Sequence, residues 1–292
     1  MSSSSGELSL SIVIGSNGAP ASVESCLAAL EPQVDGAEVL VCEPEASPPE
    51  VRERFPFARF LARPGALVPE LWRDGIDASR GRFVALTVSP MRPAENWVER
   101  IIDELERVDV VAGAVEPGER LRRCDWAEYF CRYSHDALPF EGHECVEQLP
   151  GDNAAYRRES LERMRDLFRD GFVEPFVNRR LADAGATLRH EPSVVVYQGR
   201  SAGTAAFVRQ RLEHGRDYGR RRGTAASAPR NLASAAAAPL VPFVLTARLA
   251  GRLLPNRRFR WPLLTSLLLV LAFNTAWAAG EAAGRLDALS GR

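Results

Sequence analysis

The stretch LSLSIVIGSNG (residues 8–18) places a run of apolar and β-branched residues directly before a turn of glycine and polar residues. Such a run, stopped by a Gly-Ser-Asn-Gly turn, is typical of a buried strand that ends in a loop. Beyond the loop, Cys26, Leu27 and Leu30 recur at the spacing of one helix face. The stretch therefore predicts the order strand, loop, helix at the start of an α/β domain.

The same alternation continues for about a hundred residues. We expect strands at 8–14, 38–42, 57–61, 83–87 and 108–115, and helices at 49–54, 67–79 and 96–108. Strands and helices that alternate at this pace predict a mainly parallel sheet with helices on both faces.

The pattern changes after residue 124. An aromatic helix begins there, and an irregular stretch follows it up to Pro150. We expect helices again at 157–167 and 175–184, a strand at 193–197 and a basic helix at 204–222. Irregular stretches of this length are more often functional than structural.

Composition narrows the function classes. The 292 residues carry a net charge of -1, which gives no general attraction to nucleic acid. The sequence has no G-x-G-x-x-G after a strand and no phosphate-binding G-x-x-x-x-G-K-[ST], which argues against dinucleotide oxidoreductases and NTPases. The five cysteines have no metal-ligand spacing.

Residues 1–7 lack the features of a secretion signal, so we expect the first domain to be cytoplasmic.

Two apolar stretches lie near the C-terminal end. Residues 232–247 are uncharged apart from their flanks but contain Pro239 and Pro242, whereas residues 261–280 are uncharged and long enough to cross a bilayer as a helix. Arginines precede the first stretch and separate the two, so two full spans would leave one basic cluster outside. We therefore expect the first stretch to lie in the interface or re-enter, and the second to cross. A spanning hairpin, or a buried hairpin of a soluble protein, stays an alternative.

The ends of the first two strands carry a resemblance. The strand SIVI (11–14) followed by Gly15-Ser16-Asn17, and the strand VLVC (39–42) followed by Glu43, resemble the opening of family 2 glycosyltransferases, which have the Rossmann-like GT-A fold. The resemblance implies that Ser16, Asn17 and Glu43 hold the nucleotide of a nucleotide sugar. Such a position agrees with ligand binding outside the carboxyl ends of parallel strands. The other reading of Glu43 is a solvated loop residue.

A second segment resembles the family and departs from it at one point. GIDASRGRFVAL (75–86) is similar to the family's helix-to-strand passage, but Val88-Ser89-Pro90 stands where the family has Asp-x-Asp. Those carboxylates hold a divalent cation on the diphosphate, and hard cations such as Mg²⁺ and Mn²⁺ require such oxygen ligands. The sequence thus gives no evident metal site or cofactor here. We expect Arg92 to contact the donor phosphates instead, with a solvated loop arginine as the alternative.

Two further segments resemble the parts of the family that bind the acceptor and carry the general base. LPGDNAAYRR (149–158) closely resembles the family's G-x-N-x-A-Y-R-R, which implies that Gly151 and Asn153 lie beside the sugar or acceptor. GFVEPFVNRRL (171–181) matches the segment with the general base, and the count places Glu174 on that base. The other readings make Asn153 a turn residue and helix cap, and Glu174 a carboxylate that complements a helix N-terminus.

Two C-terminal segments also resemble membrane-associated relatives. Gln210 with Gly215-Arg216 is similar to a Q-x-x-x-x-G-R pattern before the membrane segment, and WAAGEAAG (277–284) is similar to a W-x-x-G-E-x-x-G ending. We expect Gln210, Gly215 and Arg216 to be close to the membrane, where arginines face anionic headgroups.

Together these features predict four parts: a disordered N-terminus (1–7), a GT-A-like domain (8–200), a basic amphipathic helix or linker (201–230) and a membrane-associated helical segment (231–292). The expected function is that of a bacterial, membrane-associated and inverting glycosyltransferase in polysaccharide biosynthesis. Its expected partners are a nucleotide-sugar donor, a lipid-linked or cell-envelope glycan acceptor and membrane lipids. The alternative is a non-catalytic relative that lost its metal site and acts as a binding or scaffold component of glycan assembly.

Overall fold

A computed structural model describes residues 8–16, 18–144, 149–200, 203–224 and 226–290. The expectation of a disordered N-terminus concerns residues 1–7 and lies outside this part of the chain. Two compact units form: unit 1 comprises Met1–Gly118 and His135–Gly199, and unit 2 comprises Glu119–Ser134 and Arg200–Arg292. The aromatic helix α5 (Arg123–Arg132), which the sequence assigns to the first domain, belongs to unit 2.

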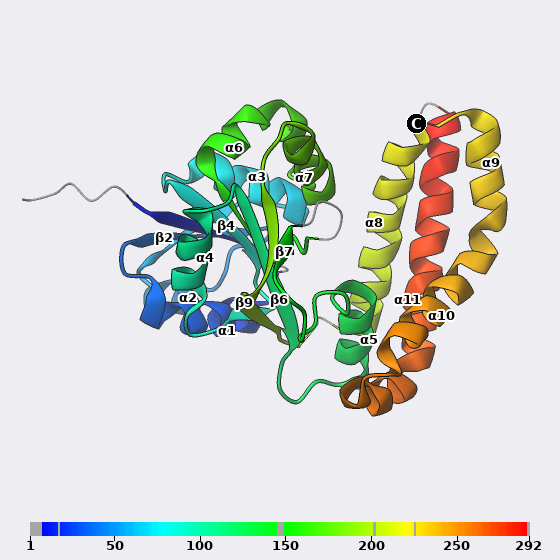
Figure 1. Ribbon diagram of the computed structural model, residues 1–292, viewed down its shortest axis with the longest axis horizontal. Coiled ribbons are helices and arrows are strands. Elements are labelled where there is room, and N and C mark those ends of the chain that lie inside the picture. The colour runs from blue at the N-terminus through cyan, green and yellow to red at the C-terminus, as the bar shows by residue number, and fades with distance from the viewer. Residues whose placement is uncertain (1–7, 17, 145–148, 201–202, 225, 291–292) are drawn as a thin grey trace, which may run out of the picture. The chain divides into compact units, whose positions relative to one another are not determined.

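Unit 1 is built on one mixed sheet (Figure 1). Its strands are β1 (Leu10–Gly15), β2 (Ala37–Glu43), β3 (Ala58–Ala62), β4 (Phe83–Val88), β5 (Met91–Pro93), β6 (Val110–Pro117), β7 (His143–Glu144), β8 (Asn153–Arg157) and β9 (Leu188–Gln198). They lie in the order β3-β2-β1-β4-β8-β6-β9-β5, and β7 pairs with β9. The first four strands in this order are parallel, as expected, whereas β8 runs antiparallel to both of its neighbours. The sheet as a whole is therefore mixed and not purely parallel.

Helices flank this sheet, and the longer ones bury an apolar stripe. They are α1 (Pro20–Leu30), α2 (Pro49–Arg54), α3 (Val68–Ala78), α4 (Trp97–Leu105), α6 (Arg158–Arg163) and α7 (Glu174–Asp183), with 3₁₀ turns η1 (Glu31–Gln33) and η2 (Arg165–Phe168). In α4 the stripe consists of Trp97, Val98, Ile101 and Leu105, all buried. Gly75 brings α3 close to the sheet, since a Cβ there would lie 2.1 Å from Val13 Cγ1.

The strand β8 is the main difference from the sequence-based expectation. The alternative reading of Asn153 makes it a turn residue and helix cap, but it is the first residue of β8, and α6 begins only at Arg158. The sequence NAAYR contains no β-branched residue, so its local preference does not indicate a strand. Pairing with β4 on one side and β6 on the other determines its conformation.

Unit 2 consists of helices. Besides α5 it contains α8 (Thr204–Thr224), α9 (Ala228–Ala237), η3 (Ala238–Leu240), α10 (Val241–Leu253) and α11 (Arg257–Leu289). Figure 1 shows α11 lying between α8 and α9. Two helical segments, Ala228–Leu253 and Arg257–Leu289, are long and apolar enough to cross a membrane, by length and composition alone.

Glycines allow α8 and α11 to run side by side at close range. A Cβ added to Gly219 would lie 2.2 Å from the Glu281 carbonyl oxygen, and one added to Gly284 would lie 1.9 Å from that of Arg216. The two helices run in the same direction, since the Phe207 ring lies edge-on to that of Phe273 and Gly223 lies against Arg285. The C-terminal motif thus packs directly against the motif that contains Gly215 and Arg216.

This contact predicts an unequal response to Gly→Ala substitutions. Gly284→Ala forces the two backbones apart and should lower the stability of the protein by about 2 kcal/mol. Gly251→Ala in α10 is the matched control, because a Cβ there meets nothing within 4 Å. That variant should be neutral or up to about 1 kcal/mol more stable, since alanine favours helix. Thermal unfolding of both purified variants measures the difference, and equal midpoints would contradict the close contact.

Candidate functional site

Three loops meet at the carboxyl ends of the parallel strands. The backbone N–H of Ser16 donates to the Cys42 carbonyl at 2.8 Å, and that of Ser89 donates to the Gly15 carbonyl at 3.1 Å. These bonds join the turns after β1 and β4 to neighbouring strand ends. Ser16 is buried, and its hydroxyl accepts the Gly18 N–H at 3.1 Å. Asn17, expected to bind nucleotide beside Ser16, lies outside the described residues.

Glu43 ends β2 with a carboxylate that the protein itself binds. Oε2 accepts the Ser47 hydroxyl at 2.6 Å, Oε1 accepts the Ser47 N–H at 3.0 Å, and Arg52 pairs with Oε1 at 2.5 Å. The Glu43 side chain is 0% exposed. Its position at the strand end agrees with the sequence, but its partners are those of a residue that holds the loop after β2. The reading as a solvated loop residue does not match this burial.

The segment that replaces Asp-x-Asp provides no carboxylate. Val88 and Ser89 are buried at the end of β4, and Pro90 leads into β5. Across the part of the chain that the structure describes, no group of three or more His, Cys, Asp or Glu side chains could hold a metal ion. The side chains present here therefore do not fit a divalent cation.

Arg92 lies on β5, next to this segment. It pairs in register with Tyr197 of β9 and is half-buried. Within the described ranges, no ion pair of Arg92 is present. This side chain is therefore a cation that forms no ion pair with the described carboxylates, close in sequence to the end of β4.

Glu174 and Gly151 lie against each other. Glu174 is the first residue of α7, and an added Cβ on Gly151 would lie 2.5 Å from its Cδ and 2.7 Å from its Oε1. Because β8 is antiparallel to β4, the residues just before β8 lie where β4 ends. Thr87 Oγ1 fixes this arrangement by donating to the Asp152 carbonyl at 2.9 Å. The structure thus brings together Gly151 and Glu174, which two different sequence motifs indicated.

Asn153 has a different environment from its neighbour Gly151. Its side-chain Nδ2 donates to the Ala114 carbonyl at 2.9 Å and the Val194 carbonyl at 3.0 Å, and its Oδ1 accepts the Trp97 indole N–H at 2.8 Å. The residue is fully buried. Both amide hydrogens are used within the sheet, so in this conformation the side chain has no donor for a sugar.

Aromatic residues form the wall behind Glu174. The Tyr156 hydroxyl donates to Asn178 Oδ1 at 3.0 Å, and the Tyr156 ring lies edge-on to Phe172, with centroids 5.4 Å apart. Burial, and next the negative charge of Glu174, raise the pKa of Tyr156 well above its usual range. Tyr156 therefore stays neutral beside Glu174.

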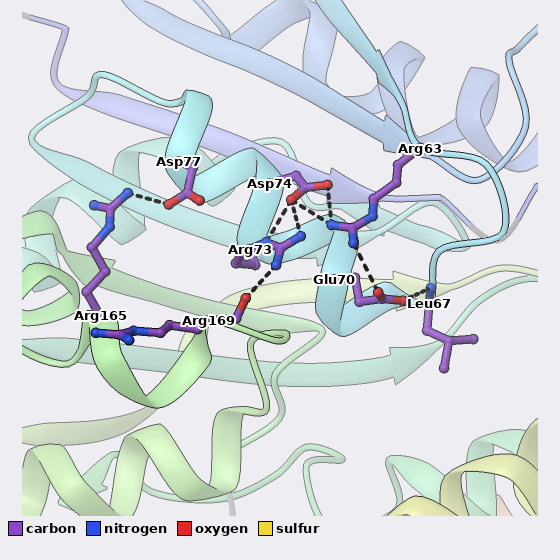
Figure 2. Close-up of polar contacts among 8 residues, drawn as sticks. All are labelled: Arg63, Leu67, Glu70, Arg73, Asp74, Asp77, Arg165 and Arg169. Carbon is purple, nitrogen blue, oxygen red and sulfur yellow. Dashed lines mark hydrogen bonds and ion pairs between the residues drawn. The ribbon is translucent and has the colours of Figure 1, made fainter.

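An ion-pair network on α3 supports this wall (Figure 2). Arg63 and Arg73 both point at the Asp74 carboxylate, at 2.9 Å and 2.6 Å, as Figure 2 shows. Arg73 also donates to the Arg169 carbonyl, which ties α3 to the segment before α7. The Phe172 N–H adds a bond to the Pro69 carbonyl at 2.7 Å. These contacts fix the approach to Glu174.

The sequence motifs did not indicate several of these residues. Asp152 is a buried carboxyl residue between Gly151 and Asn153, yet the family pattern leaves its position open. Trp72 donates its indole N–H to the Thr87 carbonyl at 2.9 Å. The centroids of the Trp72 and Phe172 rings are 6.5 Å apart. The position of Trp72 on the apolar face of α3 is the one signal that could have indicated it.

The residues expected near a membrane lie in unit 2. Gly215 packs against the Trp277 carbonyl, and Arg216 pairs with Asp287 at 2.6 Å. Gln210 lies on the same helix, α8, and is half-buried. Their relation to a membrane stays a prediction.

The buried Glu43 network predicts a stability effect. Glu43→Ala leaves the Ser47 N–H and hydroxyl without their acceptor, and should lower the stability of the protein by about 2 kcal/mol. Glu45→Ala is the matched control, since Glu45 is exposed on the same loop. It should change stability by less than about 0.5 kcal/mol. Chemical denaturation of both variants measures this, and a neutral Glu43→Ala would show that the network is not structural.

Comparison with known proteins gives a fold likeness alone. No family model matches the sequence, and no curated protein matches it. The mannosyltransferase PcManGT from Pyrobaculum calidifontis, solved in complex with GDP-Man and Mn²⁺, is similar over 97% of this chain and 75% of its own, with 17% identity and a TM-score of 0.50. A mycobacterial protein is similar over 71% of this chain and 72% of its own, with 17% identity and a TM-score of 0.47. The chain therefore has a fold similar to that of a glycosyltransferase.

Proposed function

We propose that this protein is a membrane-associated, inverting glycosyltransferase that moves a sugar from a nucleotide-sugar donor to a lipid-linked or cell-envelope glycan. The observation that carries the proposal is the contact between Gly151 and the Glu174 carboxyl group at the edge where β4 ends. Ligands of open α/β sheets bind outside such strand ends, and sugar transfer needs a base there. The fold likeness to a mannosyltransferase solved with GDP-Man supports a nucleotide sugar as donor.

In the proposed reaction Glu174 takes the proton of the acceptor hydroxyl. The hydroxyl oxygen forms a bond to the anomeric carbon of the donor sugar while the bond from that carbon to the diphosphate oxygen breaks. A nucleoside diphosphate leaves, and attack from the opposite face inverts the anomeric centre. Gly151 supports this role because the absence of a Cβ leaves room for the Glu174 carboxyl group.

The negative charge that grows on the leaving diphosphate needs a partner. Since Val88, Ser89 and Pro90 do not fit a cation, we assign this role to Arg92, whose guanidinium can bind phosphate through two hydrogen bonds. Ser16 and Asn17 complete the donor side, where we propose that they hold the nucleotide. Glu43 acts there through the loop that it holds in place.

A second candidate function is a non-catalytic binding or scaffold component of glycan assembly. Two observations favour it: the Glu43 carboxylate is bound by Ser47 and Arg52, and the Asn153 amide is bound within the sheet. A protein of this kind would keep the fold and bind a nucleotide sugar or glycan without turnover.

Titration with UDP-, GDP- and TDP-sugars, each with and without Mn²⁺, separates the two functions. We expect one donor to bind and to be consumed without Mn²⁺. Glu174→Gln should keep donor binding and lower turnover by about 10²–10⁴-fold, as loss of a general base does. Glu162→Gln is the matched control, because Glu162 is exposed on α6. Binding without turnover would favour the scaffold function, and no binding of any donor would refute the transferase.

Gly151→Ala tests the contact that carries the proposal. The new Cβ would displace the Glu174 carboxyl group, and a displacement of about 1 Å can lower a rate by about 100-fold. Donor affinity should stay unchanged. Steady-state kinetics with the donor identified above measure both quantities, and unchanged turnover would mean that Glu174 is not the base.

A further inference from the structure

The helix α11 has an exposed face and a buried face along its whole uncharged stretch. Its exposed positions recur at helical spacing, at Trp261, Leu264, Leu268, Ala272, Thr275 and Ala279. Trp261 is 74% exposed and Leu268 is 83% exposed. The opposite face, which includes Phe259, Val270 and Phe273, is buried in unit 2.

A charged helix covers the first half of the buried face. The ring of Phe130 in α5 lies 5.8 Å from that of Phe259, and Cys131 Sγ lies 4.0 Å from the Val270 carbonyl oxygen. On the same helix, Glu128 and Arg132 form an ion pair at 3.9 Å. Ionic groups therefore lie beside the first half of the apolar stretch.

A second charged helix covers the other half. The helix α8 carries eight Arg, Asp and Glu residues among its 21 residues. The Phe207 ring lies edge-on to that of Phe273, and the Arg211 guanidinium lies 4.3 Å from the centre of the Trp277 ring. Burial lowers the pKa of Arg211 to about 10, which still leaves it charged at neutral pH.

These neighbours oppose a transmembrane placement of α11. If residues 261–280 crossed a bilayer, the charges of α5 and α8 beside them would lie at the depth of the hydrocarbon. Each charged side chain costs about 2.5–3.5 kcal/mol at the centre of a membrane helix. A helix that lies along the membrane surface keeps α5 and α8 in water and its exposed stripe in lipid.

The same surface continues over the preceding helices. Leu240, Phe243 and Val244 are exposed on the η3 and α10 segment. No acidic residue occurs in the sequence between Asp217 and Glu281, whereas arginines are present at both ends of the apolar stretches. Arginines alone flank the first apolar stretch and precede the second, and such an edge is complementary to lipids with anionic headgroups, where each arginine contributes about 1 kcal/mol.

We propose that unit 2 inserts into one leaflet of an anionic membrane through η3, α10 and α11, and that neither apolar segment crosses the bilayer. This inference rests on the membrane attachment in the proposed function, but it does not depend on sugar transfer. It differs from the sequence-based expectation that residues 261–280 cross. Both arginine clusters then lie on the cytoplasmic side, in agreement with the positive-inside rule.

Reporter fusions in the full-length chain test the topology. A reporter is placed before residue 1, after Pro255 between α10 and α11, or after residue 292, with alkaline phosphatase and a fluorescent protein as the two readouts. One-leaflet insertion predicts a cytoplasmic location for all three sites. An external Pro255 site would mean that the first segment crosses, and an external C-terminus alone would mean that α11 crosses. Either result overturns the proposal.

Binding to vesicles tests the lipid-facing stripe without any nucleotide sugar. Leu268→Glu should weaken binding of the full-length protein to phosphatidylglycerol-containing vesicles by about tenfold or more, through loss of apolar transfer and added repulsion. Leu212→Glu is the matched control, because Leu212 is 44% exposed on α8 and should not contact lipid. Equal losses in the two variants would refute the proposed face. So would an absence of vesicle binding, or a stable dimer in which Leu268 is covered, whatever the outcome of the donor titration.

Discussion

The reversed direction of β8 is the constraint on which the candidate site depends. Because β8 pairs antiparallel with β4, Thr87 lies opposite Asn153, and the chain enters the strand at the edge where the parallel strands leave the sheet. Gly151 is thereby placed beside the first turn of α7, with Glu174 against its backbone. A parallel strand in this position would carry the same residues to the opposite edge. A strand that its own residues do not indicate thus places Gly151 against the carboxyl group of the proposed base.

Charge compensation separates the two sides of the site. On the side of β2 and β3, the carboxylate of Glu43 and the guanidinium of Arg63 each have partners within the protein, Arg52 and Asp74. Such pairs fix loop geometry, but their charges are already offset and attract a ligand only weakly. A leaving diphosphate therefore needs a cation from elsewhere, which is the physical reason for assigning this role to Arg92.

Periodicity predicted most elements of unit 1, whereas tertiary pairing determined the rest. The helix expected at 67–79 is α3 (Val68–Ala78), and the strand expected at 83–87 is β4 (Phe83–Val88), because in both cases local preference and burial agree. β8 could not be predicted from its own residues, and neither could the saturated hydrogen bonds of Asn153, whose partners Trp97, Ala114 and Val194 are distant in sequence. Motif spacing did indicate Gly151 and Glu174, but their contact emerges only from the fold.

In unit 2, hydropathy likewise gives no information on contacts with residues that are distant in sequence. Taken in isolation, residues 261–280 satisfy every length and charge criterion for a membrane span. A hydropathy window along one helix contains no information on the helices that pack against it. The glycines of α8 bring a charged helix within backbone contact of α11, with Gly219 against Glu281 and Gly215 against Trp277. Close glycine-mediated packing usually indicates association inside a membrane. Here it joins an apolar helix to one that water must solvate, so the packing favours the membrane surface over the membrane interior.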